Sequence, residues 1–168
     1  MEPIPYDKRS GKIWFNGTPI NWSEVKIHVL SHGLHYASCV FEGERVYDGE
    51  IFKLEEHTER LFHSASRLGF EIPYTQASLN KACNEIVTIQ KVKNGYVRPV
   101  AWRGSEMMAI SAQKTKIHVA IAAWEWGSYF DPNLKLKGIK LDISKWKRPA
   151  PDTIPWDTKA SGLYMICT

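Results

Sequence analysis

The chain has 168 residues, a length typical of one ordinary domain or two small ones and sufficient to bury a hydrophobic core. Apolar residues make up 43% of it and charged residues 24%, which excludes an intrinsically disordered chain and a fibrous repeat. The 22 basic side chains exceed the 18 acidic ones by four and are interleaved with them, so the charge gives little support to a basic nucleic-acid-binding module.

Three cysteines, Cys39, Cys83 and Cys167, are widely separated and form no Cys-x-x-Cys pair. Their number and spacing predict reduced thiols and a cytoplasmic location. The N-terminus has no basic segment followed by an apolar one, and no apolar stretch is long enough to cross a bilayer. We therefore expect a soluble, unprocessed protein with neither a membrane nor a nucleic acid among its partners.

Two hairpins are predicted in the first third of the chain. A short strand over 13–15 runs into Asn16-Gly17, a pair that accepts the positive φ angles of a type I′ turn. Residues 39–47 read as a second strand, Asp48-Gly49 as its turn, and residues 50–54 as the returning strand.

The middle of the chain predicts two amphipathic helices, over 55–68 and 76–93, followed by strands over 96–103 and 116–126. The second of these strands is almost continuously apolar and is expected to be central, whereas Pro99 marks the first as an edge strand or a bulge. This order predicts an α+β domain, a small twisted antiparallel sheet with both helices packed on one face.

The segment 104–114 carries Met107, Met108 and Ile110 without a clear period. It is expected to be a loop, and a second subunit could cover its apolar side chains.

Beyond a boundary near 127–137, residues 138–146 read as another strand, and a proline-rich stretch then excludes helix until Thr158. Residues 159–168 begin an apolar helical pattern that stops without a capping signal. Such a helix has nothing to pack its remaining face against, so we expect a chain interrupted inside a larger domain.

Metal chemistry has one weak candidate, the histidines His28, His32 and His35. An i, i+4 histidine pair on a helix can hold a metal, but no cysteine or carboxylate is placed to complete the coordination shell. We therefore predict capping or structural histidines and no metal. No glycine-rich phosphate loop and no serine nucleophile elbow is present.

Three basic residues could carry chemistry. Arg60 lies on the polar side of the predicted helix, a position that is usually solvated. Arg98 alternates with Tyr96 and Trp102 on a strand face and needs a partner such as a carboxylate or a phosphate. Lys159 follows the proline-rich stretch and opens an apolar segment, where a desolvated amine could serve Schiff-base chemistry.

Five separated segments, in order and in register, resemble the branched-chain amino-acid aminotransferases of the fold-type IV pyridoxal-phosphate enzymes. They are IHVLSHGLHY at 27–36, VFEGER at 40–45, EHTERL at 56–61, YVRP at 96–99, and the stretch from APDTIP at 150–155 to KASGLY at 159–164. The resemblance extends from about Ile13 to the last residue.

The resemblance implies a role for each matching residue. Lys159 corresponds to the lysine that binds pyridoxal phosphate as a Schiff base and then moves the proton at the substrate Cα. Arg60 corresponds to the arginine on the cofactor phosphate, and Tyr164 to the tyrosine near the cofactor's 3′-oxygen. The wall of the substrate pocket would comprise Tyr36, Phe41, Tyr96, Arg98, Trp126 and Tyr129.

The implied reaction is ping-pong amino transfer between leucine, isoleucine or valine and 2-oxoglutarate, catalysed by a homodimer. Residues 1–130 would form the small N-terminal domain, and 131–168 the linker and incomplete start of the large cofactor-binding domain. Family members are roughly twice as long, and their later half supplies the acid at the pyridine nitrogen and further phosphate donors. The 168 residues alone are therefore predicted to be inactive or nearly so.

Two other interpretations of the sequence stay open. The chain could come from another fold-type IV enzyme, a D-amino-acid aminotransferase or an aminodeoxychorismate lyase, although the segments at 40–45 and 96–99 favour the branched-chain enzymes. It could also be a non-catalytic, self-associating fragment.

Overall fold

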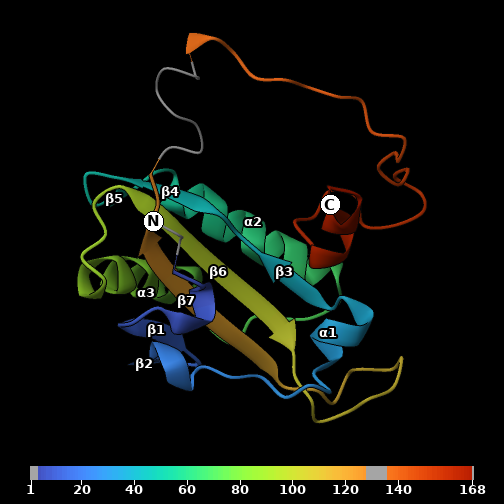
Figure 1. The fold of residues 1–168 in the computed structure, drawn as a ribbon. Helices are drawn as coiled ribbons and strands as arrows, with labels where there is room; N and C mark the ends of the chain where they lie inside the picture. The colour runs from blue at the N-terminus through green and yellow to red at the C-terminus, as the bar shows by residue number, and fades with distance from the viewer. Residues whose placement is uncertain (1–3, 128–135, 168) are drawn as a thin grey trace.

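The computed structural model describes residues 4–127 and 136–167, and within them seven strands form one antiparallel sheet (Figure 1). The strand order is β2-β1-β7-β6-β4-β5, and β3 pairs with β6 beside β4. The strands are β1 (Lys12–Phe15), β2 (Thr18–Asn21), β3 (Cys39–Phe41), β4 (Glu44–Tyr47), β5 (Glu50–Ile51), β6 (Gly95–Arg103) and β7 (Ile117–Glu125). The helices are α1 (His32–Tyr36), α2 (Leu54–Arg67) and α3 (Gln76–Ile89), with 3₁₀ helices at Tyr6–Lys8, Trp22–Glu24 and Ser161–Cys167. The predicted α+β class is confirmed.

One face of the sheet is covered by α2 and α3, which lie together behind the strands in Figure 1. Their apolar faces and the inward side chains of the strands form the main core, because the helical and strand periods present apolar residues to the same layer. Its fully buried members include Leu61, Leu79, Ile86, Val40, Val97 and Ile121. The predicted packing of two helices on one face is confirmed.

The starts of α2 and α3 are each fixed by the residue that precedes the helix. Lys53 adopts a left-handed conformation at φ 59°, so the predicted return strand to residue 54 is wrong: β5 ends at Ile51 and α2 starts at Leu54. The side chain of Thr75 caps α3 by accepting a hydrogen bond from the backbone N–H of Ser78 at 3.1 Å.

The end of α3 differs from the prediction, which extended the helix to residue 93. The helix ends at Ile89 because Lys91 takes a left-handed conformation at φ 54°. That reversal brings Val92 into the core, where it is 3% exposed.

Both predicted hairpin turns are confirmed. Asn16 and Gly17 have φ values of 48° and 108°, and Asp48 and Gly49 have values of 51° and 87°. Two successive positive φ angles are the mark of a type I′ turn, whose twist matches that of the flanking strands.

Pro99 does not mark an edge. β6 pairs with β7 along its whole length and with β3 and β4 on its other side, so it is central, and β7 is central as predicted. Pro99 lies opposite the gap between β3 and β4, where its carbonyl accepts a hydrogen bond from the backbone N–H of Glu42 at 2.9 Å. The missing proline N–H points to the same side as that carbonyl, so it falls where the neighbouring ladder is interrupted.

The opposite face of the sheet carries an aromatic layer that α2 and α3 do not cover. Trp22, Trp102 and Trp124 are buried in it, and Phe15, Tyr96 and Trp126 pack against them. Most of the tryptophan excess of the sequence is used here.

Residues 138–146 form no strand, which corrects the prediction made from their alternating pattern. They are irregular, and Leu141, Ile143 and Trp146 remain largely exposed. Figure 1 shows this stretch, coloured orange, running outside the body of the protein, where no other described segment offers a strand to pair with. An apolar alternation becomes a strand only when a neighbour satisfies its backbone groups.

The predicted helix at the C-terminal end begins later and is tighter than expected. Ala160 pairs with Val40 in an extended bridge, so the helix starts at Ser161 and has 3₁₀ geometry. The segment 104–114 is a loop as predicted, with Ile110 88% exposed; its cover by a second subunit stays a prediction. Within the described residues, no helix is long and apolar enough to span a membrane.

Candidate active site

Lys159 is held by two elements that lie far from it in sequence. Its backbone N–H donates to Ser64 Oγ on α2 at 3.0 Å, and its carbonyl accepts from the N–H of Phe41 on β3 at 3.2 Å. The hydroxyl of Ser161 donates to the carbonyl of Cys39 at 3.2 Å. The segment around Lys159 therefore lies as a short extra strand along β3, which fixes the position of its side chain.

The amine of Lys159 lies beside two aromatic rings, Phe41 and Tyr164, whose centres are 4.9 Å apart. Its Nζ donates to the hydroxyl oxygen of Tyr164 at 2.6 Å and lies 4.8 Å from the centre of that ring and 4.9 Å from the centre of the Phe41 ring. Among the described residues Lys159 forms no ion pair. An amine beside aromatic rings and bonded to a phenol can act as a nucleophile or a proton acceptor once it loses its proton.

Phe41 links this amine to an arginine on the same face of the sheet. Phe41 pairs with Val100, so its side chain shares a face with Tyr96 and Arg98. The Arg98 guanidinium lies 4.6 Å from the Phe41 ring centre and 5.2 Å from that of Tyr96, and its Nη2 donates to the Tyr96 hydroxyl at 3.3 Å.

Arg98 has no carboxylate partner in the described part of the chain. Tyr96 in turn packs edge-on against Trp126, with 5.0 Å between ring centres. The result is a continuous surface from the Lys159 amine to Trp126, with an uncompensated cation in it.

Arg60 is oriented by a carboxylate buried in the sheet. Glu42 is 0% exposed and accepts hydrogen bonds from Arg60 Nε at 2.6 Å, from Arg60 Nη2 at 2.8 Å and from His57 Nδ1 at 2.9 Å. Burial raises the pKa of Glu42, but the hydrogen bonds from Arg60 and His57 outweigh it, so the pKa lies below its usual value.

This fork leaves the Nη1 donors of Arg60 free toward solvent, and half of its side chain is exposed. The hydrogen bond to Glu42 raises the pKa of Arg60, and the Tyr164 phenol adds a smaller contribution. Arg60 and Tyr164 are therefore close enough to interact electrostatically, although Arg60 reaches the site from α2, which covers the face of the sheet opposite to Phe41.

A second carboxylate, Glu44, is buried two residues further along the same face. It is 0% exposed, and neither carboxylate oxygen has a hydrogen-bond partner within the described residues. Burial, and next the charge of Glu42, raise the pKa of Glu44 to about 8. Burial of Cys83 on α3 raises the pKa of its thiol, and the charge of Glu44 raises it further. Cys83 therefore lies near Glu44.

The structure brings most of the predicted site residues together but not all. Lys159, Tyr164, Phe41, Tyr96, Arg98 and Trp126 form the continuous surface, with Arg60 near Tyr164. Tyr36 lies apart at the end of α1, against His32 with 4.5 Å between ring centres, beside a cavity of about 210 Å³. Tyr129 lies outside the described residues.

The three histidines of the metal hypothesis have separate partners. His28 Nδ1 accepts from the N–H of Leu30, whereas His32 Nε2 and His35 Nε2 bond to the carbonyl oxygens of Ala109 and Val29. Among the described residues no cluster of histidine, cysteine and carboxylate side chains could hold a metal.

Sequence reasoning missed Glu42, His57 and Ser64. The signal for Glu42 was present, since Glu42 and Glu44 alternate with Val40 and Val46 and therefore face the core with them. A carboxylate in such a register is buried and needs a cationic partner.

Comparison with known proteins shows which family the chain belongs to. The family model of amino-transferase class IV matches residues 39–159. A branched-chain-amino-acid aminotransferase of Pseudomonas aeruginosa is 38% identical over 161 residues, which is 94% of this chain and 52% of that protein. The Escherichia coli K12 protein of the same name is 36% identical over 163 residues, 94% of this chain and 53% of its own length. The chain thus spans about half the length of the curated relatives it matches.

Solved structures give a consistent result. A crystal structure of the T.th. branched-chain amino acid aminotransferase with pyridoxamine 5′-phosphate is similar with a TM-score of 0.88 and 37% identity, covering 94% of this chain and 53% of that one. The enzyme from Thermoproteus uzoniensis, crystallised with norvaline, has a TM-score of 0.86 and 34% identity, with 94% and 54% covered. The match of the family model and the geometry around Lys159 lead to one conclusion: the chain belongs to the class IV aminotransferase family.

Proposed function

We propose that the chain is part of a branched-chain-amino-acid aminotransferase that uses pyridoxal phosphate to exchange amino groups between leucine, isoleucine or valine and 2-oxoglutarate. The observation that carries this proposal is the placement of Lys159 Nζ 2.6 Å from Tyr164 Oη and beside the Phe41 ring, with Arg60 close enough to Tyr164 to interact electrostatically. The named relatives favour this reaction over the D-amino-acid aminotransferase and lyase alternatives.

The residues present fit the cofactor. Arg60 keeps Nη1 donors for a phosphate oxygen while Glu42 fixes its plane. The hydroxyl of Tyr164, already bonded to Lys159 Nζ, is a donor for a phenolic oxygen. When bound, pyridoxal phosphate supplies an aldehyde that condenses with amines and a pyridine ring that takes up the electron pair released at the substrate Cα.

Lys159 does two things in this proposal. Its primary amine would hold the cofactor through the aldehyde carbon in the resting enzyme. When a substrate amine takes that place, the Lys159 amine would move the proton from the substrate Cα to the former aldehyde carbon, and in the opposite direction in the second half of the exchange. The hydrogen bond to Tyr164 and the bridge between Ala160 and Val40 hold the amine in reach of these carbons.

The substrate is proposed to lie against the surface that Phe41, Tyr96 and Trp126 form. A place for Tyr36 and Tyr129 in the same pocket stays a prediction from the resemblance. Aromatic faces suit a branched aliphatic side chain, and Arg98 supplies the charge that a carboxylate needs. The same arginine would let glutamate enter as amino donor, because its second carboxylate would also find a cationic partner.

We infer a small domain over 1–130 and a linker with the start of the cofactor-binding domain over 131–168. The relatives are about twice as long, so turnover is proposed for an enzyme with both domains, and the 168 residues alone are predicted to be inactive or nearly so. A homodimer is part of the proposal, with the exposed 104–114 loop directed at a second subunit. The free cysteines are consistent with a cytoplasmic location.

The test is covalent trapping of the cofactor. The chain is incubated with pyridoxal phosphate, reduced with borohydride, and the adduct is located by peptide mass mapping. We expect one dominant adduct at Lys159, because no other lysine of the described residues has the two aromatic rings and the phenol beside its amine.

Two variants complete this experiment. Lys159→Arg keeps the positive charge and is expected to lose the adduct, whereas Lys147→Arg, at an exposed position, should keep it. An adduct spread evenly over many lysines, or one that persists in Lys159→Arg, would contradict the assignment of the Schiff-base lysine.

A further inference from the structure

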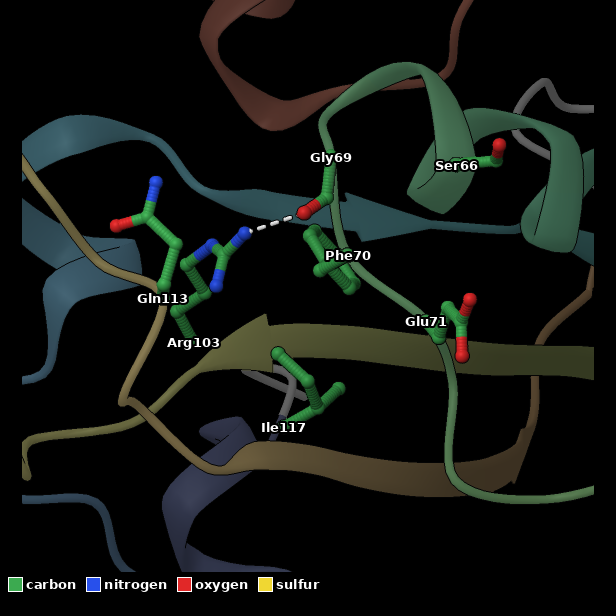
Figure 2. Close-up of a pocket in the computed structure, with 7 residues that line it drawn as sticks. All are labelled: Ser66, Gly69, Phe70, Glu71, Arg103, Gln113 and Ile117. Atoms are coloured by element: carbon green, nitrogen blue, oxygen red, sulfur yellow. Dashed lines mark hydrogen bonds between the residues drawn. The ribbon is translucent and has the colours of Figure 1, made fainter.

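A cleft of about 470 Å³ shares no residue with the Lys159 surface, and Figure 2 shows the side chains that line it. It opens between the end of β6, the turn after α2 and the loop that leads into β7. Its lining consists of Ser66, Gly69, Phe70, Glu71, Arg103, Gln113 and Ile117.

Arg103 is a buried cation in this cleft without a counterion. The residue is 8% exposed, and its guanidinium donates to the carbonyls of Gly69 at 2.6 Å and Ala112 at 2.8 Å and to Thr115 Oγ1 at 3.4 Å. All of these acceptors are neutral, and the guanidinium carbon lies 5.4 Å from the centre of the Phe70 ring. Burial lowers the pKa of Arg103, and no neighbouring anion opposes this effect.

Two other arginines differ from Arg103 because they have carboxylate partners. Arg60 and Arg67 each pair with a carboxylate, Glu42 and Asp157 respectively, although both are far more exposed than Arg103. A desolvated charge normally carries a counterion, because an unpaired ion loses its hydration on burial without compensation. Within residues 4–127 and 136–167, Arg103 has none.

The donors that remain on Arg103 suit an oxyanion. Its Nε–H has no partner in the described part of the chain, and it is not among the polar atoms sealed from solvent. The Nη2 group donates to Gly69, and the Nε–H beside it remains as a charge-assisted donor for an oxygen of a carboxylate or phosphate. The Ser66 hydroxyl and the Gln113 amide are further neutral groups of the same cleft.

Glu71 limits what the cleft accepts. It is the carboxylate of the lining, and Figure 2 shows its carboxyl group directed away from the Arg103 guanidinium. A ligand with negative charge at both ends would meet this carboxylate, so the cleft favours a small molecule with one anionic group.

We propose that this cleft is a second binding site, in which Arg103 binds the oxyanion of a small carboxylate or phosphate ester. Arg103 also bonds to Ala112 and Thr115, which belong to the loop after β6, so the site is directly connected to that loop. The proposal does not depend on the aminotransferase assignment, since the cleft and the Lys159 surface have no residue in common.

The test is an NMR titration of the arginine Nε–Hε signals of the unmodified chain. Inorganic phosphate and acetate are added separately to about 50 mM, with chloride at matched ionic strength as reference. We expect a saturable shift of the Arg103 signal with a dissociation constant of about 1–10 mM for at least one of them. The phosphate arm supports a phosphate-ester ligand and the acetate arm a carboxylate ligand.

Variants and internal controls separate this site from others. The Arg103 signal is assigned by its absence in Arg103→Lys, which keeps the charge but lacks the Nε–H, and saturable binding at this site should vanish there. Arg67→Lys, at an exposed ion pair, should leave the titration unchanged. A phosphate-dependent shift of Arg60 is scored separately, because it reports the proposed cofactor site.

The titration of the unmodified chain decides the question even if Arg103→Lys fails to fold. Absence of a saturable Arg103 shift with both anions, or equal shifts of all arginines, would overturn the proposal.

Discussion

Replacing Glu44 by leucine is expected to stabilise the protein by about 3 kcal/mol at pH 8 and by much less at pH 5. Glu44 is fully buried in the main core with both oxygens unpartnered, and its pKa is raised to about 8. In the unfolded chain the same carboxyl ionises near its ordinary value of 4.5. Between these two pH values the folded state therefore binds more protons than the unfolded state.

The sign of the pH dependence follows directly. The contribution of Glu44 to the free energy of unfolding is least unfavourable below pH 4.5, falls as the pH rises toward 8, and is constant above that. Leucine has no such cost and fills the same apolar surroundings. The gain should therefore grow steadily between pH 5 and pH 8.

Urea unfolding of the parent and Glu44→Leu at several pH values measures the difference in their free energies of unfolding. Taking this difference removes the contribution of all other titrating groups. The difference in free energy of unfolding between Glu44→Gln and Glu44→Leu should not change with pH, because neither side chain titrates. Glu44→Gln should be the less stable of the two, because its amide stays unpartnered. Glu50→Gln, at an exposed position of β5, serves as the control and should follow the parent at every pH. Parallel pH profiles for the parent and Glu44→Leu would show that Glu44 is not buried as described.

Replacing Glu42 by glutamine is expected to have the opposite effect, a loss of about 2 kcal/mol of stability at neutral pH. Glu42 accepts three charge-assisted hydrogen bonds from Arg60 and His57, and glutamine cannot accept the Arg60 fork as an anion does. Arg60 is half exposed and can be hydrated again, so the loss stays below that of a fully buried pair.

This loss also depends on pH, with the sign reversed. The pKa of Glu42 is lower in the folded protein, so the ion pair adds stability above pH 4.5 and loses it as the pH falls through the folded pKa. The difference between parent and Glu42→Gln should therefore shrink at acid pH. Removing the Glu42 charge should also lower the pKa of Glu44, because that charge helps to raise it.

A cofactor measurement tests the positioning role of Glu42. Without the fork Arg60 is no longer fixed in its plane, and the affinity for pyridoxal phosphate should fall about tenfold, equivalent to about 1.4 kcal/mol. Glu56→Gln removes an exposed pair with Lys53 and is the matched control, with affinity unchanged. Equal affinities in Glu42→Gln and the parent would mean that Arg60 needs no support from Glu42.

Much of the fold could be predicted because its signals are local. The helical period of α2 and α3, the positive-φ turn pairs and the apolar run in β7 each lie within a few consecutive residues. The incorrect predictions are those that depend on which strand lies beside a segment in the fold. The alternation over 138–146 finds no neighbouring strand, and Pro99 is accommodated in a central strand because the ladder beside it is interrupted.

The site divides in the same way. Arg98 could be identified from its strand alternation, whereas Lys159, Arg60 and Tyr164 were predicted from segments that resemble a family. The pairing of Arg60 with Glu42 could not be predicted, because it depends on how α2 lies across the sheet. A burial pattern in the sequence shows that a carboxylate faces the core and does not show which cation reaches it.

The short bridge that carries Lys159 has a consequence for the order in which the protein folds. Its hydrogen bonds to Ser64 and from Ser161 to Cys39 span 95 and 122 residues along the chain, so they close the longest loops of the site. Such contacts form after the local ones, and here they form on a β3 and α2 that are already packed. The same segment buries Ala160 and Leu163 in the main core, where they are 7% and 5% exposed, so its docking completes that core. The reactive amine is thus attached to the part of the molecule that we expect to be assembled last.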